Sequence, residues 1–109
     1  MPTRSTTTCS RNDVVLLPIP FTDLTSRKVR PAIVVGGKGT DLFGVPVSSV
    51  LTNTDFQLQE WQTAGLNVAS GVKAQLATVE ERLIIRTIGH ITDADRELLN
   101  DKLRSWLQL

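Results

Sequence analysis

The side chains in this sequence that are best suited to chemistry are one arginine and two hydroxyl groups. Arg30 follows a loop that also holds Arg27 and Lys28 with no acid among them, and Ser48 and Ser49 end an apolar run. A guanidinium is always charged, and its planar fork of donors suits a phosphate oxyanion. A phosphodiester cleaved by its own 2′-hydroxyl needs little beyond charge stabilisation, proton transfer and in-line positioning. These residues fit such a site, although composition alone favours an ordinary surface arginine in a solvated loop.

Other catalytic arrangements lack the residues that they need. His90 is the only histidine and Cys9 the only cysteine, so a Ser-His-Asp or Cys-His site would depend on one imidazole. A zinc site with ordinary ligand spacing is excluded for the same reason. Glu80 and Glu81 are adjacent, so their side chains point apart. No glycine-rich phosphate loop of the Walker kind is present. We therefore expect neither a metal nor another cofactor.

Composition and charge describe a small globular chain without a strong electrostatic bias. It has 109 residues, of which 40% are hydrophobic, and a formal net charge of +1. These values suit a single domain over 12–109 behind a flexible lead at 1–11, and they give no global electrostatic case for nucleic acid. The apolar runs are too short to cross a bilayer, and the lead lacks the apolar stretch of a secretory signal. We therefore expect a cytoplasmic protein.

Apolar and β-branched runs predict a mainly β fold. The runs lie at 13–20, 30–37, 42–50, 72–79 and 82–91, and the weaker pattern over 51–69 predicts a loop with one short strand. Pro18 predicts that the first strand lies at an edge or leaves the sheet there. Glycines at 36, 37 and 39 predict a turn, and Gly44 with Pro46 predicts a bulge or bend.

The last part of the sequence predicts one helix. Thr92 can cap its first turn, where Asp93 and Asp95 suit the helix dipole. The apolar residues then recur at three- and four-residue spacings and form a single stripe: Leu98, Leu99, Leu103, Trp106 and Leu107. Short strands followed by one packing helix predict a small, strongly bent antiparallel sheet or partial barrel.

Three segments, taken in order, resemble the MazF/PemK family of toxins from type II toxin–antitoxin systems. They are NDVVLLPIPFTDLTSRKVRPAIVV from residue 12, FGVPVSSV from residue 43 and AGLNVASGVKAQLATVEERLIIRTIGHIT from residue 64. No single motif is decisive, because an Arg-Pro pair is common. The order and spacing of the three are much more specific, and the match extends from about Asn12 to Leu109.

The resemblance implies a fold, an activity and a set of site residues. It implies an SH3-like small barrel of the CcdB/MazF kind with a C-terminal helix, and a metal-independent, sequence-specific endoribonuclease that cleaves single-stranded mRNA and arrests growth. Arg30 would take the place of the family's catalytic arginine, where it would stabilise the phosphorane. Ser48 would take the place of a catalytic threonine, keeping its hydroxyl without the methyl that stiffens χ1. The remaining residues expected to bind RNA are Asp23, Lys28, Ser49, Lys73 and Gln75.

Two other functions remain open for the same barrel. It could be catalytically weak or inactive and bind only RNA or an antitoxin, or it could poison DNA gyrase as the related CcdB toxins do. Those toxins end in Trp-Gly-Ile, whereas this sequence ends in SWLQL.

The resemblance and the residue pattern both predict a homodimer with an antitoxin as partner. Leu83 and Ile85 point to one side of their predicted strand and Ile84 to the other, so both sides carry apolar bulk. We expect an interface that includes Ile84 or Ile85 and part of the last helix, with the RNA groove along it. The antitoxin would lay an acidic tail over the same groove, against Lys28 and Arg30.

Overall fold

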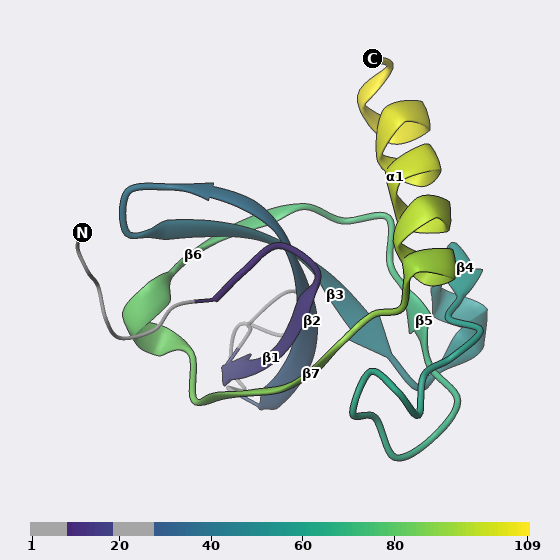
Figure 1. Cartoon of the computed structure of the whole chain (residues 1–109), viewed down its shortest axis with the longest axis horizontal. Helices are drawn as coiled ribbons and strands as arrows, with labels where there is room; N and C mark the ends of the chain where they lie inside the picture. The colour runs from purple at the N-terminus through teal and green to yellow at the C-terminus, as the bar shows by residue number, and fades with distance from the viewer. Residues whose placement is uncertain (1–8, 19–27) are drawn as a thin grey trace.

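The computed structural model describes residues 9–18 and 28–109, which form one bent antiparallel sheet and a C-terminal helix (Figure 1). The sheet has seven strands, and six of them follow the order β4-β5-β3-β2-β1-β7, with β6 beside β3. The strands are β1 (Asp13–Pro18), β2 (Val29–Lys38), β3 (Asp41–Ser48), β4 (Phe56–Gln57), β5 (Gly71–Val72), β6 (Ala77–Glu80) and β7 (Arg86–His90). No ladder among the described residues joins β4 to β7, so the sheet is strongly bent but not closed. The expected mainly β fold with one helix is confirmed.

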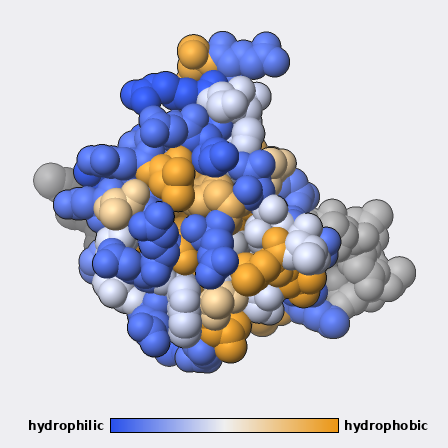
Figure 2. All heavy atoms as spheres, turned by 90° about the vertical axis from the view of Figure 1, so that its right-hand side faces the viewer, coloured by the Kyte–Doolittle hydropathy of each residue, from blue (hydrophilic) through white to orange (hydrophobic). Residues whose placement is uncertain are grey.

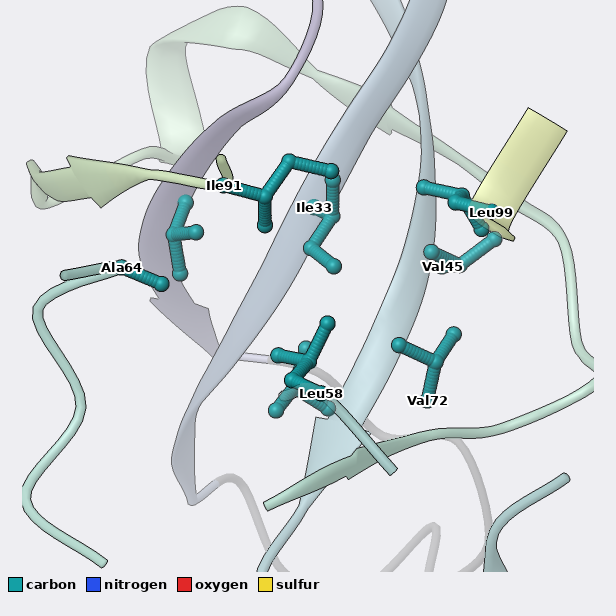
Figure 3. Close-up of a cluster of buried hydrophobic side chains, with 9 residues drawn as sticks. Ile33, Val45, Leu58, Ala64, Val72, Ile91 and Leu99 are labelled. Carbon is teal, nitrogen blue, oxygen red and sulfur yellow. The ribbon is translucent and has the colours of Figure 1, made fainter. Parts of the chain in front are cut away.

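Both faces of the sheet carry buried apolar side chains. Ile33 of β2 belongs to the first cluster, whereas its neighbours Ala32 and Val34 belong to the second, as the alternation of a strand requires. Figure 3 shows the first cluster, in which the sheet, the segments after β3 and the helix α1 (Asp93–Leu107) meet at Ile33, Val45, Leu58, Ala64, Val72, Ile91 and Leu99. The second cluster comprises Val15, Leu17, Ala32 and Val34, with Cys9, Leu42, Val79 and Ile84 packed against it.

The helix begins as the sequence predicts, but only part of its apolar stripe is buried. The Thr92 hydroxyl accepts a hydrogen bond from the Asp95 N–H at 3.4 Å. Leu99 is buried, and Leu103 and Trp106 pack against the first cluster. Leu107 is 48% exposed, because the last turns of α1 project beyond the sheet (Figure 1). Figure 2 shows the molecule from the side on which α1 lies, where hydrophobic residues are interspersed with hydrophilic ones.

The predicted strand over 72–79 is wrong, because the ladder breaks in its middle. Val72 pairs with Val47 and Ala77 with Gly44, so two extra residues lie on the outer strand. The Gln75 N–H donates to the Lys73 carbonyl at 2.8 Å, which turns the chain out of the ladder. The run therefore forms β5, a bulged segment at 73–76, and β6.

The predicted strand over 82–91 also begins too early. Residues Glu81–Leu83 form a 3-10 turn, η2, and a second such turn, η1 (Leu51–Asn53), follows β3. Ile84 packs on the second cluster, while Leu83 and Ile85 are exposed. The predicted alternation of these three residues is therefore present although the strand itself begins only at Arg86.

Gly36, Gly37 and Gly44 act differently from what the sequence indicates. Gly36 and Gly37 lie inside β2, and the turn between β2 and β3 falls at Gly39, whose φ is +65°. The extra residue lies in β2, between Val34 and Gly36, and not in β3. The prediction for Pro18 is confirmed on one side of β1, because the strand ends there and Pro18 pairs with Val29 of β2, whereas the β1–β7 ladder already ends at Leu16. Residues 1–8 of the predicted lead and 19–27 of the basic loop lie outside the described residues.

Candidate functional site

Arg30 and Ser48 lie at the same end of two neighbouring strands. The β2–β3 ladder ends at the pair of Ala32 with Pro46, and two residues further along each antiparallel strand come Arg30 and Ser48. Residues two apart in a strand share a face, so both side chains leave the face that carries Ala32 and the second cluster. Arg30 is exposed and Ser48 is half-buried. A guanidinium and a hydroxyl thus stand at the open rim of an apolar cluster.

The Ser48 hydroxyl is held by the backbone that follows it. Its Oγ accepts a hydrogen bond from the Val50 N–H at 3.0 Å. A hydroxyl has a second lone pair and one hydrogen, so this contact leaves the hydrogen free to donate to a phosphate oxygen. The same contact restricts the side chain, which partly replaces the stiffness that a β-methyl would supply.

A close approach of backbone supports Ser48 from the neighbouring strand. Gly71 of β5 pairs with Ser48, and a Cβ on Gly71 would lie 2.7 Å from the Phe56 carbonyl oxygen. Only glycine lets β4 and β5 pack this closely. Gly71 lies between the weak pattern over 51–69 and the run over 72–79, so the sequence predicted no role for it and its supporting role was missed.

Lysine 73 joins the same face from the other side of β3. The Lys73 N–H donates to the Pro46 carbonyl at 3.0 Å, which continues the β3–β5 register by one residue. Lys73 therefore shares the face of Pro46 and Ser48, and it is half-buried. No ion pair joins Arg30 or Lys73 to a carboxylate within residues 9–18 and 28–109. Two cations on one face can thus meet an anionic ligand.

The other predicted site residues lie less close together. Lys28 and Ser49 are exposed, one just before β2 and the other just after β3. Gln75 is half-buried in the bulged segment, away from the regular β3 register. Asp23 lies outside the described residues. The site as described therefore centres on Arg30, Ser48 and Lys73.

Exposed apolar side chains flank the candidate site, and the sequence predicted only Ile85 among them. Val29 is 52% and Val50 53% exposed, next to Arg30 and Ser49 in the chain. On the far side of β1, the Ile85 N–H donates to the Leu16 carbonyl, and Leu17 pairs with Arg30. Ile85 therefore lies about two strands from Arg30, or roughly 10 Å, and it is 56% exposed. The sequence signal for these valines was their position, since Val29 precedes Arg30 and Val50 lies two residues after Ser48.

The lone cysteine thiol is not activated as a nucleophile. Burial raises the pKa of the Cys9 thiol, a hydrogen bond with Thr87 lowers it, and the charges of Asp13 and Glu81 raise it further. His90 is an exposed residue paired with Asp13 across β1 and β7. In the part of the chain that the structure describes, no three His, Cys, Asp or Glu side chains gather as metal ligands. No helix there is long and apolar enough to cross a membrane.

Family comparison gives a match over nearly the whole chain. The model of the PemK-like, MazF-like toxins of type II toxin–antitoxin systems matches residues 10–107. No curated protein sequence matches significantly.

Solved structures share the fold at low sequence identity. Mycobacterium tuberculosis toxin MazF-mt6 superposes with a TM-score of 0.72 at 16% identity, covering 89% of this chain and 97% of that one. An endoribonuclease in complex with its cognate antitoxin, from a mycobacterial species, has a TM-score of 0.67 at 17% identity, covering 91% and 92%. A mycobacterial endoribonuclease has a TM-score of 0.64 at 18% identity, covering 91% and 90%. At these identities the structures support the fold.

Proposed function

Because the chain belongs to the PemK-like, MazF-like toxins of type II toxin–antitoxin systems, we propose that it is an endoribonuclease that cleaves single-stranded mRNA in the cytoplasm without a metal ion. The observation that carries this proposal is the common face of Arg30 and Ser48, with Lys73 on the other side of β3. Two structural relatives are named as endoribonucleases. Growth arrest follows from loss of mRNA.

In this proposal the RNA supplies its own nucleophile. The 2′-hydroxyl loses its proton to water and its oxygen forms a bond to phosphorus. The bond from phosphorus to the 5′-oxygen breaks and that oxygen takes a proton from water, so that a 2′,3′-cyclic phosphate and a 5′-hydroxyl result. Arg30 stabilises the added charge on the phosphorane oxygens, where a preorganised donor is most effective. The Ser48 hydroxyl donates a hydrogen bond to a phosphate oxygen. This contact holds the phosphate so that the attacking 2′-oxygen is in line with the leaving 5′-oxygen. The path of the RNA strand is lined by Lys28, Ser49, Lys73 and Gln75, together with Asp23.

The decisive experiment is cleavage of single-stranded RNA by the purified protein in EDTA. We expect Arg30→Ala to lower the cleavage rate by about 10²–10³ or more, and Arg30→Lys to be nearly as poor because a point charge does not replace the planar fork. Arg82→Ala is the matched control, since Arg82 is exposed and pairs only with Glu80 among the described acids. Wild-type activity in Arg30→Ala rejects the site. Loss of all cleavage in EDTA rejects the metal-independent mechanism, and a wild-type protein inactive under every condition identifies a binding-only barrel.

Ser48 allows a second test of the same site. Ser48→Ala removes the donor, so we expect it to be nearly inactive. Ser48→Thr keeps the hydroxyl and fixes its rotamer, so we expect equal or higher activity. Undiminished cleavage by Ser48→Ala would show that the Ser48 hydroxyl is not needed and that Arg30 acts without it.

We also propose that the toxin is a homodimer inhibited by an antitoxin. The exposed surface of Leu83 and Ile85 adjoins Arg30 across β1, so a two-fold contact there would bring the RNA groove to the interface. The last turns of α1 lie at the opposite end of the molecule (Figure 1), so this proposal leaves that end of the helix out. An acidic antitoxin tail over Lys28 and Arg30 would compete with RNA phosphates. Sedimentation equilibrium of wild type and Ile85→Glu tests the interface, and an unchanged dimer in the variant rejects it.

A further inference from the structure

The segment that links β3 to β4 forms a small turn beside the candidate site. It comprises residues 49–55, contains the η1 turn, and lies where the end of β3 meets β4 and β5 (Figure 1). Two of its backbone bonds are local: the Asn53 N–H donates to the Val50 carbonyl at 3.0 Å, and the Thr54 N–H donates to the Leu51 carbonyl at 3.1 Å. The segment is therefore held in shape by contacts that it makes with itself.

The side chain of Thr54 closes this turn. Its Oγ1 donates to the Leu51 carbonyl at 2.7 Å, so one carbonyl accepts both the N–H and the hydroxyl of the same residue. A threonine hydroxyl can bond in this way to a carbonyl three residues earlier in the chain. At the next residue the Asp55 N–H donates to the Val72 carbonyl at 2.8 Å. Thr54 is thus fixed to the turn on one side, and its neighbour is fixed to β5 on the other.

The Thr54 hydroxyl also lies on the Ser48 side of the sheet. Ser48 pairs with Gly71, and the side chains of paired residues in an antiparallel ladder leave the same face. A Cβ on Gly71 would lie 2.5 Å from the Thr54 Oγ1, so this oxygen occupies the space that a side chain at position 71 would need. Since paired Cβ positions are about 4.5–5.5 Å apart, the Thr54 hydroxyl lies within about 8 Å of the Ser48 Cβ. The glycine makes room for the threonine beside Ser48.

We infer that Thr54 is a positioning residue for Ser48. The Val50 N–H, which donates to the Ser48 Oγ at 3.0 Å, belongs to the turn that the Thr54 hydroxyl closes. This N–H engages one lone pair of the Ser48 oxygen, so a shift of the turn rotates the serine side chain and redirects its hydrogen. The effect on cleavage rests on the proposed nuclease activity, whereas the coupling between Thr54 and Ser48 does not.

The geometry favours this indirect role over a direct contact with RNA. The one hydrogen of the Thr54 hydroxyl already goes to the Leu51 carbonyl, so it is not available to a phosphate oxygen. Thr54 is half-buried, whereas Val50 in the same turn is 53% exposed. Thr54 therefore supports Ser48 from within the turn.

Steady-state cleavage of single-stranded RNA by the full chain tests the inference. Thr54→Val keeps the shape of the side chain and the backbone bond to Leu51 but removes the hydroxyl, and Thr54→Ser keeps the hydroxyl. We expect Thr54→Val to lower kcat about tenfold or more with KM within about twofold of the wild type, because misplacement of a catalytic group is felt in the transition state. Thr54→Ser should cleave at close to the wild-type rate. Thr78→Val, at an exposed threonine of β6, is the matched control and should cleave as the wild type does.

Three kinetic outcomes overturn the inference. The first is a wild-type kcat in Thr54→Val, or equal losses in Thr54→Val and Thr54→Ser. The second is a rise of KM with kcat unchanged, because Thr54 would then bind RNA itself. The third concerns the double variant: without the Ser48 hydroxyl there is nothing to position, so adding Thr54→Val to Ser48→Ala should leave the residual rate unchanged. A further loss in the double variant would mean that Thr54 acts on the fold in general and not through Ser48.

Amide NMR gives a readout that does not depend on cleavage. Ser48→Ala removes the acceptor of the Val50 N–H, so it defines the direction in which the Val50 amide proton shift moves when that bond is lost. We expect Thr54→Val to move the shift in the same direction and Thr54→Ser to leave it near the wild-type value. An unchanged Val50 shift in Thr54→Val overturns the inference. A protein that shows the expected shifts but cleaves no RNA rejects the nuclease proposal alone, whereas a wild-type kcat in Thr54→Val rejects the positioning role alone.

Discussion

The buried carboxylate of Asp95 offers a sharp test of how α1 is fixed to the rest of the molecule. Asp95 is 0% exposed in the first turn of α1. One of its carboxylate oxygens accepts from the Gln59 N–H at 2.9 Å and the other from the Glu60 N–H at 3.0 Å. These bonds hold the turn that follows β4 against the helix. Asp95→Asn keeps the shape and size of the side chain but replaces one acceptor by an NH₂ group.

The expected cost follows from the two contacts. A hydrogen bond to a charged group contributes about 1.5–3 kcal/mol, and a buried N–H left without an acceptor costs about 1–3 kcal/mol. The variant loses one such bond and leaves one donor facing another donor, while burial of a neutral group is less costly than burial of a charge. We expect a net loss of about 3 kcal/mol in the free energy of unfolding. For a domain of this size that lowers Tm by about 12 °C.

Asp93→Asn is the matched control. It lies in the same first turn and also meets the helix dipole, but its side chain is 93% exposed and its only recorded pair, with Arg96, is 3.5 Å long. We expect it to cost less than about 1 kcal/mol. Urea unfolding of both variants followed by circular dichroism, at one protein concentration because assembly would shift the midpoint, gives the comparison. If Asp95→Asn comes within 0.5 kcal/mol of Asp93→Asn, roughly the scatter expected of a surface substitution, the carboxylate contacts do not stabilise the fold.

Three further predictions test the packing, the thiol and the face of the site. Gly65 has a φ of +89°, and a Cβ there would collide with a main-chain carbonyl of β7. Gly65→Ala should therefore lower the free energy of unfolding by more than about 3 kcal/mol, whereas Gly39→Ala, with a φ of +65° and open space around it, should lower it by about 1 kcal/mol. Similar urea midpoints for the two variants would contradict this. Burial raises the pKa of the Cys9 thiol, so less thiolate is present near pH 8 and its reaction with Ellman's reagent should be slower folded than in urea; equal rates would show an unhindered, unperturbed thiol. Adding Val29→Arg to Arg30→Ala should not restore RNA cleavage, because adjacent strand residues point to opposite faces; full rescue would mean that the face of the guanidinium does not matter.

The parts of the fold that follow local rules could be predicted from sequence, and register could not. β1 and β2 coincide with apolar runs, and Thr92 caps α1 where its hydroxyl predicts. The run over 72–79 alternates from Val72 to Leu76, yet β5 has already ended at Val72, and β5 and β6 pair with β3 two residues out of step. Alternation reports which face a side chain takes, but it does not report where a ladder loses its partner.

The candidate site shows the same division. The chemistry of Arg30 and its place in the family could be predicted from residue types and motifs. That it shares a face with Ser48 depends on the pairing of Ala32 with Pro46, which brings together residues from two strands. Asp95 was missed as a buried anchor for the same reason, since its partner Gln59 is 36 positions away. The sequence indicates an acid suited to the start of a helix, and only the tertiary contact buries it.

The placement of Arg30 follows from how the alternation of β2 ends. Val34 and Ala32 are buried on the second-cluster face, and the next position on that face is Arg30, which is exposed. The apolar residues fix the strand, and the guanidinium then stands where the cluster meets solvent. A charge at such a rim interacts more strongly with a phosphate than one surrounded by water, because part of its environment has a low dielectric constant. It also avoids the cost of full burial, which an arginine at the next position on that face, occupied by Ala32, would incur. An apolar strand that ends in a basic residue therefore both builds the core and presents the charge.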